Sequence, residues 1–391
     1  MIGFNDSWRG GRRFCAALVL VIGVALGGAA VAAPVVPNDP ALILERLPAR
    51  DGEIWDDIRA LHVAIAASPE DASLAAELAQ RYLERNRSVG DPRLVAYASR
   101  ALAHWDGVAA PPVEIALERA LIAQTEHRFD AARAELGRVV ERAPRSSQAW
   151  LALATIDTVQ GRYADAKRGC ARLVFLQDAV VAGACFAAVQ AVTGDAAAAY
   201  RFLTQSLERP EAPEPGSLAW LATLAAETAD GLGRHDDADR HYRAALAASD
   251  PQPSIYLLTA YADFLLRRER PAAVIALLES APPADSPLLR LALAEARMGR
   301  DAGARVETLR FRLELALRGE DRAHAREAAF FALHLDHDAG RALALALDNW
   351  AVQREPVDAR LVLDAAAAAA MPNAAQPVRD WLASNGTERT P

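Results

Sequence analysis

The sequence predicts an all-α fold, an α-solenoid wound as a right-handed superhelix of about eight to nine helix-turn-helix repeats. The first observation is an alanine that stands five residues after a turn position at six places. These pairs are Gly161/Ala166, Gly194/Ala199, Gly233/Ala238, Gly299/Ala304, His127/Ala132 and Arg268/Ala273. The turn positions lie 34, 33, 39, 35 and 31 residues apart, which is the period of repeats built from two short helices.

Composition is the second observation. Of the 391 residues, 52% are hydrophobic but only 6% are aromatic. Much of the remaining hydrophobic fraction is alanine. Alanine favours helices and lets them approach one another closely. A single core would normally divide a chain of this length into domains, whereas in a solenoid each repeat packs only on its neighbours.

The charge balance bears on the kind of partner. The chain carries 43 basic and 51 acidic residues, a formal net charge of −8. The sequence shows no basic stripe that would neutralise phosphates, so it argues against nucleic-acid binding. The charge is typical of a solvated exterior.

The N-terminus has the pattern of a secretory signal peptide, assigned to residues 1–32. Arg9, Arg12 and Arg13 precede an apolar run, residues 14–31, which ends in the small-x-small site around Ala32. Cleavage there predicts a periplasmic or secreted protein. The alternative is an uncleaved anchor in the inner membrane, because a run of about 18 residues is at the lower limit for a spanning helix.

Residues 33–51 are rich in proline and predict a linker, followed by N-terminal repeats over 52–208. The first helix is expected at 53–67, where apolar residues recur at helical spacing. The next is expected to begin at Ser68 as N-cap and Pro69 as first helical residue. A turn at residues 90–92 then leads into a helix ending near Trp105.

The clearest register aligns residues 113–146 with 147–180 at an offset of 34. Apolar or small residues coincide at each core position. The expected order is a helix from Trp150 to Val159, a turn at Gly161 and a helix from Ala164 to Leu176. Glycine supplies the left-handed turn, and Ala166 stands where the two helices cross closely.

Residues 209–216 form a proline-rich insertion that explains the step of 39. C-terminal repeats and a capping helix with Trp381 are predicted over 217–383, and a polar tail over 384–391. The expected helices after the insertion are 218–231, 235–248, 255–267, 271–280, 288–298, 302–317, 322–335, 339–353, 359–370 and 376–383.

The pattern over residues 68–356 resembles the tetratricopeptide repeat (TPR) family. Trp150 and Leu153 match the opening of its signature, with Ala154 in place of the signature glycine. Ala238 and Tyr242 match the middle of the signature. Ala166-x3-Cys170, Ala132-x3-Leu136 and Ala199-x3-Leu203 match it in residue class, and Pro144, Pro251 and Pro356 close repeats.

The resemblance implies that the first helix of each repeat lines the concave face of the superhelix. From the register, the candidate groove residues are Glu114, Glu118, Gln124, Gln148, Thr155, Thr158, Glu227, Asp230, Arg290, Arg297 and His334. We therefore expect a non-catalytic scaffold or adaptor of the cell envelope, without cofactor, that holds a peptide or partner protein in this groove. If the signal peptide is not cleaved, the alternative prediction is a membrane-tethered assembly factor.

After removal of the signal peptide, two cysteines remain, Cys170 and Cys185. Their spacing places them on neighbouring helices of successive repeats, where a disulfide would join the repeats if their Cα atoms lie within about 7 Å. The alternative is two buried small residues that never meet. An exported chain reaches an oxidising compartment, where such a bond persists.

Two other polar clusters contain residue types that bind metals. His334, Asp336, His337 and Asp338 resemble metal ligands, but an inter-helix turn with Asp338 as N-cap explains them better. The acids and histidines of residues 235–241 are expected at a helix start.

The competing enzymatic hypothesis is a glycoside-acting protein on a helical scaffold, using two of Asp157, Glu227 and Glu295. The sequence has no nucleophile elbow, P-loop or paired-histidine zinc motif, so we expect neither catalysis nor a bound metal. The tryptophans occur at most once per repeat, which is the spacing of core anchors.

Overall fold

The computed structural model describes residues 53–176, 179–209, 215–249, 252–319 and 324–385. The predicted signal peptide and linker lie outside these ranges, as do residues 210–214 of the insertion and 386–391 of the tail. Residues 51–391 belong to one compact unit. Within the described ranges the regular structure is helical, which confirms the all-α prediction.

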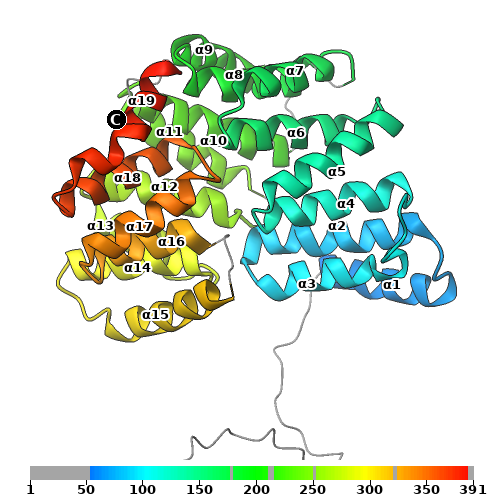
Figure 1. Cartoon of the computed structure of the whole chain (residues 1–391), viewed down its shortest axis with the longest axis horizontal. Helices are drawn as coiled ribbons and strands as arrows, with labels where there is room; N and C mark the ends of the chain where they lie inside the picture. The colour runs from blue at the N-terminus through cyan, green and yellow to red at the C-terminus, as the bar shows by residue number, and fades with distance from the viewer. Residues whose placement is uncertain (1–52, 177–178, 210–214, 250–251, 320–323, 386–391) are drawn as a thin grey trace, which may run out of the picture. The chain divides into compact units, whose positions relative to one another are not determined.

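The helices follow one another without a change of architecture (Figure 1). In chain order they are α1 (Glu53–Ala67), α2 (Ala72–Val89), α3 (Pro92–Ala101), the 3₁₀ helix η1 (Ala103–Trp105), α4 (Val113–Thr125), α5 (Phe129–Arg142), α6 (Ser147–Val159), α7 (Tyr163–Leu173), α8 (Ala179–Val192), α9 (Ala196–Leu207), α10 (Pro215–Gly231), α11 (His235–Ala247), α12 (Ile255–Arg267), α13 (Pro271–Leu278), α14 (Asp285–Arg297), α15 (Gly303–Arg318), α16 (Ala325–His334), α17 (Ala339–Trp350), α18 (Pro356–Ala368), the 3₁₀ helix η3 (Pro372–Ala375) and α19 (Gln376–Ser384).

From α2 onward the helices form antiparallel pairs, α2 with α3 through α18 with α19, while α1 packs on α2 at the start of the array. We call the even-numbered first member of each pair the A helix and the second the B helix. Each A helix packs on its own B helix, and most pairs also contact the next pair, which is the solenoid arrangement that the period predicts. Helix α10 packs on both α8 and α9, so the stack continues across the insertion.

One turn recurs between A and B helices. A residue in the left-handed conformation ends the A helix, and the amide of the following residue donates to a carbonyl five residues earlier. Such bonds join Arg128 to Ala123, Arg162 to Asp157, Asp195 to Gln190, Arg234 to Ala229, Arg270 to Leu265 and Arg300 to Glu295, at 2.6–3.2 Å. This is the helix C-terminal motif in which an otherwise unpaired carbonyl is satisfied.

The left-handed residue is the predicted one at His127 and at the four repeat glycines. The prediction for Arg268 is wrong by one position, because Glu269 has the positive φ of 54°. The residue five positions later is then Val274, which is fully buried, and not Ala273. A non-glycine residue in this conformation leaves no mark in the sequence pattern.

Four of the six predicted crossing alanines are fully buried, namely Ala132, Ala166, Ala199 and Ala238. Ala304 is exposed, which contradicts its predicted role. The reason is register, because α7 begins two residues after Gly161 whereas α15 begins four residues after Gly299.

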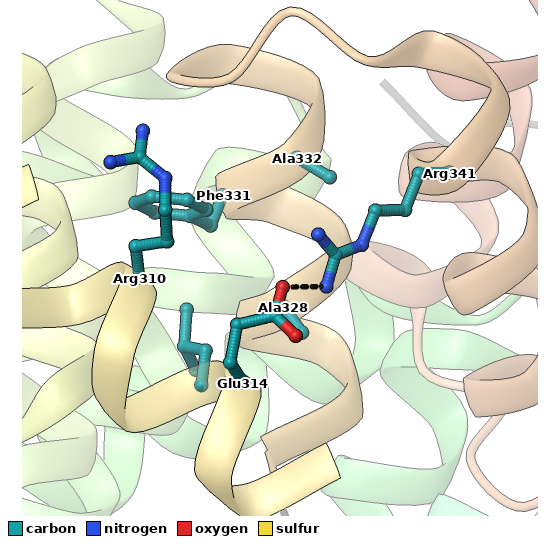
Figure 2. A pocket seen from close by; sticks show the side chains of 7 residues that line it. Arg310, Glu314, Ala328, Phe331, Ala332 and Arg341 are labelled. Carbon is teal, nitrogen blue, oxygen red and sulfur yellow. Dashed lines mark hydrogen bonds and ion pairs between the residues drawn. The ribbon is translucent and has the colours of Figure 1, made fainter. Parts of the chain in front are cut away.

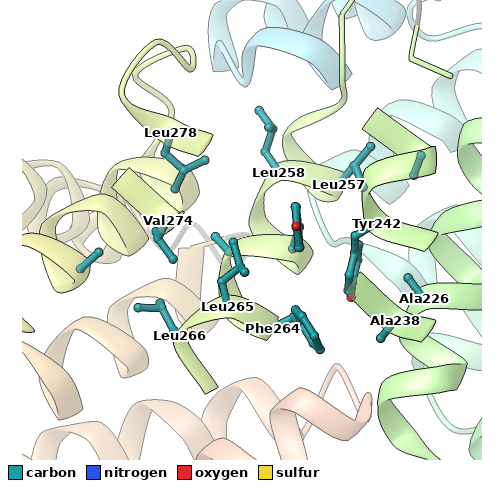
Figure 3. Packing of buried hydrophobic residues seen from close by; sticks show 14 of the residues in the cluster. Ala226, Ala238, Tyr242, Leu257, Leu258, Phe264, Leu265, Leu266, Val274 and Leu278 are labelled. Atoms are coloured by element: carbon teal, nitrogen blue, oxygen red, sulfur yellow. The ribbon is translucent and has the colours of Figure 1, made fainter. Parts of the chain in front are cut away.

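Apolar side chains fill the layer between the A and B helices. Figure 3 shows the cluster around α10 to α13, where Tyr242 stacks on Tyr261 with ring centroids 4.9 Å apart. Phe264 tilts against the same tyrosine at 5.5 Å. Burial of such rings between repeats stabilises each interface along the array.

Several predicted helix ends shift by a few residues. Helix α2 begins at Ala72, and its N-cap is Asp71 rather than Ser68, because the Asp71 carboxylate accepts from the amides of residues 73 and 74. Helix α10 begins at Pro215, inside the predicted insertion, since proline is favoured in a first helical turn. Helix α3 ends at Ala101 and is followed by η1 instead of continuing to Trp105.

Candidate interaction surface on the A helices

The eleven candidate groove residues all lie on A helices, as the register predicts. They are Glu114, Glu118 and Gln124 on α4, Gln148, Thr155 and Thr158 on α6, Glu227 and Asp230 on α10, Arg290 and Arg297 on α14, and His334 on α16. Their surroundings differ widely. Gln148, Thr155 and Arg297 are exposed, whereas Glu118, Asp230 and Arg290 are buried.

Ion pairs join consecutive A helices in the C-terminal half, and we call this set the charge ladder. Asp230 of α10 pairs with Arg267 of α12 at 2.5 Å. Arg290 of α14 donates to both carboxylate oxygens of Asp263 on α12, at 2.8 and 2.9 Å. Sequence reasoning singled out Asp230 and Arg290 but missed their partners, whose four-residue spacing on one helix was the available signal.

The ladder continues to the last A helix. Arg290 also lies 3.7 Å from Glu327 of α16, whose carboxylate accepts from Ser286 at 2.7 Å. Arg326 of α16 then bonds both carboxylate oxygens of Asp358 on α18, at 2.7 and 2.9 Å. Buried charges persist only when paired and hydrogen-bonded, and these pairs meet that requirement.

Arg290 and Arg326 both stay charged. Burial alone would lower the pKa of Arg326, but the carboxylates of Asp358 and Glu355 outweigh it and raise that pKa well above its usual value. Burial opposes the charge of Arg290 in the same way, and Asp263 raises its pKa. Arg290 was predicted to be a groove cation, but the structure commits its guanidinium to neighbouring helices.

Glu227 and Tyr256 form a different kind of contact on the same side of the array. The Tyr256 hydroxyl donates to Glu227 Oε1 at 2.5 Å, joining α10 to α12. Tyr256 is 56% exposed. Burial, with a further contribution from Glu355, raises the pKa of Glu227 to about 7, although the bond from Tyr256 lowers it. This pair therefore combines solvent access with surroundings that are largely protein.

Glu118 is the one candidate with an unsatisfied carboxylate oxygen among the described residues. It is 4% exposed, and its Oε2 atom has no hydrogen-bond partner. Burial raises its pKa to about 7, against the attraction of Arg87 on α2. Such a group is neutral over much of the acidic range and costly when ionised.

The three carboxylates of the enzymatic hypothesis have separate structural partners. Asp157 accepts from Arg133 at 2.7 Å and from Arg162 at 2.9 Å. Glu295 accepts from Arg305 at 3.1 Å. Each contact joins neighbouring helices or closes a turn, and none brings two of the three carboxylates together.

The polar clusters weighed as metal sites also have structural partners. Asp338 accepts from the amide of Arg341 and caps α17, as predicted, while Asp336 bonds Arg310 at 2.6 Å. Burial, together with Arg297 and Arg290, lowers the pKa of His334 to about 4.

In the cluster of residues 235–241, His235 lies 3.2 Å from Asp230, and Asp237 bonds two arginines. Within the described ranges, His, Cys, Asp and Glu side chains form no group of three suited to a metal.

The described residues border two hollows, one in each half of the array. A cavity of about 10 Å³ between α15, α16 and α17 is bordered by Arg310 and Phe331, and Arg341 reaches across it to Glu314 at 2.5 Å (Figure 2). It is large enough for about one water molecule. A wider cleft of about 590 Å³ is lined by α3, the segment before α4, α4 and α5, and its three arginines are each paired with an acid.

Cys170 of α7 and Cys185 of α8 form a disulfide, with Cα atoms 5.6 Å apart. Both are buried in the cluster between the two helical pairs. The bond joins successive repeats at the position that the sequence indicated.

The sequence matches no protein-family model and no curated protein. The recurring helix pair, its left-handed turn and its buried alanine decide the assignment. The fold is an α-solenoid of helix pairs that resembles the tetratricopeptide repeat arrangement.

Solved structures with a similar arrangement include TPR proteins. A tetratricopeptide repeat protein from Parabacteroides merdae ATCC 43184 is 14% identical with a TM-score of 0.43, covering 66% of this chain and 91% of that one. Yeast Tom70 is 11% identical with a TM-score of 0.38, covering 85% and 81%. The Rap protein complexed with competence and sporulation factor is 11% identical with a TM-score of 0.48, covering 86% and 96%.

Proposed function

We propose that this TPR-like solenoid is a non-catalytic scaffold of the cell envelope that binds a segment of another protein on its A helices. The observation that carries the proposal is the Tyr256–Glu227 pair. An aromatic ring that is 56% exposed beside a hydrogen-bonding carboxylate offers apolar area and a directional contact together. Tyrosine in such a setting is a common anchor of protein interfaces.

The envelope location is supported by two features of the chain. The first is the signal pattern of residues 1–32, and the second is the disulfide between Cys170 and Cys185, a bond that persists in oxidising compartments. None of the described helices has the length and apolar character needed to cross a membrane. N-terminal sequencing of the mature protein tests cleavage near Ala32, and an intact residue 1 would support the tethered alternative.

The binding test uses Tyr256→Ala and Glu227→Gln. Proteins captured by the wild-type chain from the cell envelope after crosslinking are identified, and their affinities are then measured individually. We expect Tyr256→Ala to weaken binding by roughly tenfold or more and Glu227→Gln to weaken it less. Met371→Ala, which removes a residue that is 55% exposed elsewhere on the array, is the matched control. Unchanged affinities for every captured protein would refute binding at this pair.

One observation favours the glycoside-acting alternative. A carboxylic acid with a pKa near 7 is suited to general-acid catalysis, and Glu227 has that property with a second carboxylate, Glu355, acting on it. Hydrolysis of envelope glycans that disappears in Glu227→Gln, with the fold intact, would establish this alternative. Glu355 is hydrogen-bonded to Arg326, which makes it the weaker member of such a pair.

A further inference from the structure

The end of the array contacts the second and third helix pairs of its N-terminal half. Gln353 and Arg354, between α17 and α18, contact the turns of the α4–α5 and α6–α7 pairs. Gln353 Nε2 lies 2.8 Å from His127 Nδ1, and the amide of Arg354 donates to the carbonyl of Val159 at 2.7 Å. Trp381 of α19 packs on Tyr163 with ring centroids 5.8 Å apart. We call these contacts the seam.

Trp381 makes the tightest contact of the seam. It lies directly over Gly161, where an added Cβ atom would stand 2.6 Å from the indole ring. Trp350 packs against the same indole, edge to face, with ring centroids 5.2 Å apart. Helix α19 itself is nine residues long and buries only Val378 and Leu382, so the terminal helix depends on this tryptophan for its position.

The polar part of the seam is tied to the charge ladder. Gln353 is 3% exposed and accepts from Arg326 at 2.7 Å while its amide nitrogen meets His127. Burial and the positive charge of Arg326 lower the pKa of His127, so its ring is neutral near pH 7 and Nδ1 can accept from Gln353.

The seam and the Tyr256–Glu227 pair share one element. Glu355, the N-cap of α18, directly follows the seam residues. Burial raises the pKa of both Tyr256 and Glu227, and the charge of Glu355 adds to each shift. Because Arg354 and Glu355 are adjacent in the chain, closing the seam fixes the start of α18. Opening the seam would move the start of α18 away. The remaining repeats would stay packed, because each pair is held by its own neighbours.

We propose that the seam is a reversible latch, which opens to admit a partner segment to the A helices and closes with α18 beside it. This regulation rests on the proposed function of the Tyr256–Glu227 pair. The contacts that must break lie mainly between short connections, a terminal helix and turns. The interfaces between successive pairs stay in place, as does the contact of α2 with α12, which also joins the two halves of the array.

Amide hydrogen exchange measures the latch without any partner. The Arg354 amide bonds across the seam, and the Arg162 amide bonds within its own turn, to Asp157. A latch predicts that the Arg354 amide exchanges through an opening separate from global unfolding, at a rate insensitive to low urea. Exchange of Arg354 only by global unfolding would overturn the proposal.

Two glycine variants give a matched comparison. Gly161 and Gly233 occupy the same turn position with φ of 72° and 74°, but an added Cβ at Gly233 meets nothing within 4 Å. Both Gly161→Ala and Gly233→Ala carry the same backbone strain. We expect Gly161→Ala to speed exchange of the Arg354 amide by about tenfold or more and Gly233→Ala to change it by less than about twofold. Equal effects would refute the latch.

A crosslink separates this inference from the binding proposal. His127→Cys and Gln353→Cys are joined by a short bis-maleimide linker, and capture of partner proteins is compared before and after linking. Loss of capture on linking supports the latch, and unchanged capture shows that binding does not need the opening and overturns it. If Tyr256→Ala binds its partners normally while the Arg354 amide still exchanges through a separate opening, the proposed binding site is refuted. The opening of the seam then stands without it.

Discussion

The α6–α7 and α14–α15 pairs share a turn but not a packing. Both A helices end in a left-handed glycine followed by the same five-residue hydrogen bond. After it, Ala166 is fully buried at the helix crossing, whereas Ala304 is exposed. The turn therefore reverses the direction of the chain. Which residue of the next helix is buried at the crossing depends on where that helix starts.

The two pairs are also held by different forces. The α6–α7 pair closes on apolar residues and is joined to α8 by the disulfide. Helix α14 is joined to α12 and α16 through the charges of Arg290, and α15 buries only Leu309 and Leu313. Four changes test this contrast and one tests the buried charge of Glu118 on α4, taken from the largest expected effect to the smallest.

Arg290→Met should have the largest effect, because it removes the cation beside the partly buried carboxylates of Asp263 and Glu327. We expect a loss of about 3–5 kcal/mol in the free energy of unfolding, measured by urea titration. Arg297→Met on the same helix is the control and should cost less than about 1 kcal/mol, since Arg297 is exposed. A small loss for Arg290→Met would mean that charge does not hold this region together.

Removing the disulfide tests the α6–α8 region. Cys170→Ala with Cys185→Ala opens a loop of 15 residues and should lower the free energy of unfolding by about 3 kcal/mol. A reducing agent should lower the stability of the wild-type chain by a similar amount and leave the double variant unchanged. Sensitivity of the double variant to the reducing agent would contradict this account.

Alanine-to-leucine substitutions compare the two crossings directly. Ala166→Leu inserts three carbon atoms at a fully buried contact and should cost about 1–3 kcal/mol. Ala304→Leu, at the same distance from its glycine, is exposed and should change stability by less than about 0.5 kcal/mol. Thermal unfolding of both proteins checks the difference, and equal shifts would remove the register argument.

Glu118→Gln should stabilise the N-terminal repeats. Burial raises the pKa of Glu118 to about 7, so ionisation weakens the folded state as pH rises from about 4.5 to 7. At pH 8 the neutral glutamine should gain about 1–3 kcal/mol, and at pH 4 the gain should vanish. Glu114→Gln, on the same helix, is the control for helix propensity, and a gain independent of pH would exclude the buried charge as its source.

The smallest effect is expected on α15. Phe311 and Leu315 are 71% and 60% exposed, so Phe311→Ser should change the free energy of unfolding by less than about 0.5 kcal/mol. Its effect should be on solubility, measured by light scattering. A loss of several kcal/mol would show that this face of α15 is covered in solution.

The sequence predicted those features that depend on local pattern. The period, the limits of the first helix at 53–67, the left-handed glycines and the placement of the candidate residues on A helices all follow from spacing. Glu269 escaped because an ordinary residue in a left-handed turn has no signature. The start of α15 was predicted within one residue, at 302 instead of Gly303, but the exposure of Ala304 near that start was not.

The seam was not predicted from the sequence, for a different reason. Contacts such as Trp381 with Tyr163 depend on the small rotation between successive repeats, summed over most of the array. No local pattern encodes that sum. The sequence predicted only part of the charge ladder. Asp230 and Arg290 were candidates because they are charged A-helix residues, but their pairing depends on the distances between helices.

The separation of His127 from Gln353 has a consequence for folding kinetics. Their contact spans 226 residues, whereas each repeat turn closes a bond over five. The entropy of loop closure grows with the length enclosed, and rates fall as contacts become more distant in sequence. Helix pairs should therefore form early, and the join between the array's two ends should be the last step of refolding, so its slowest phase should report on Trp381.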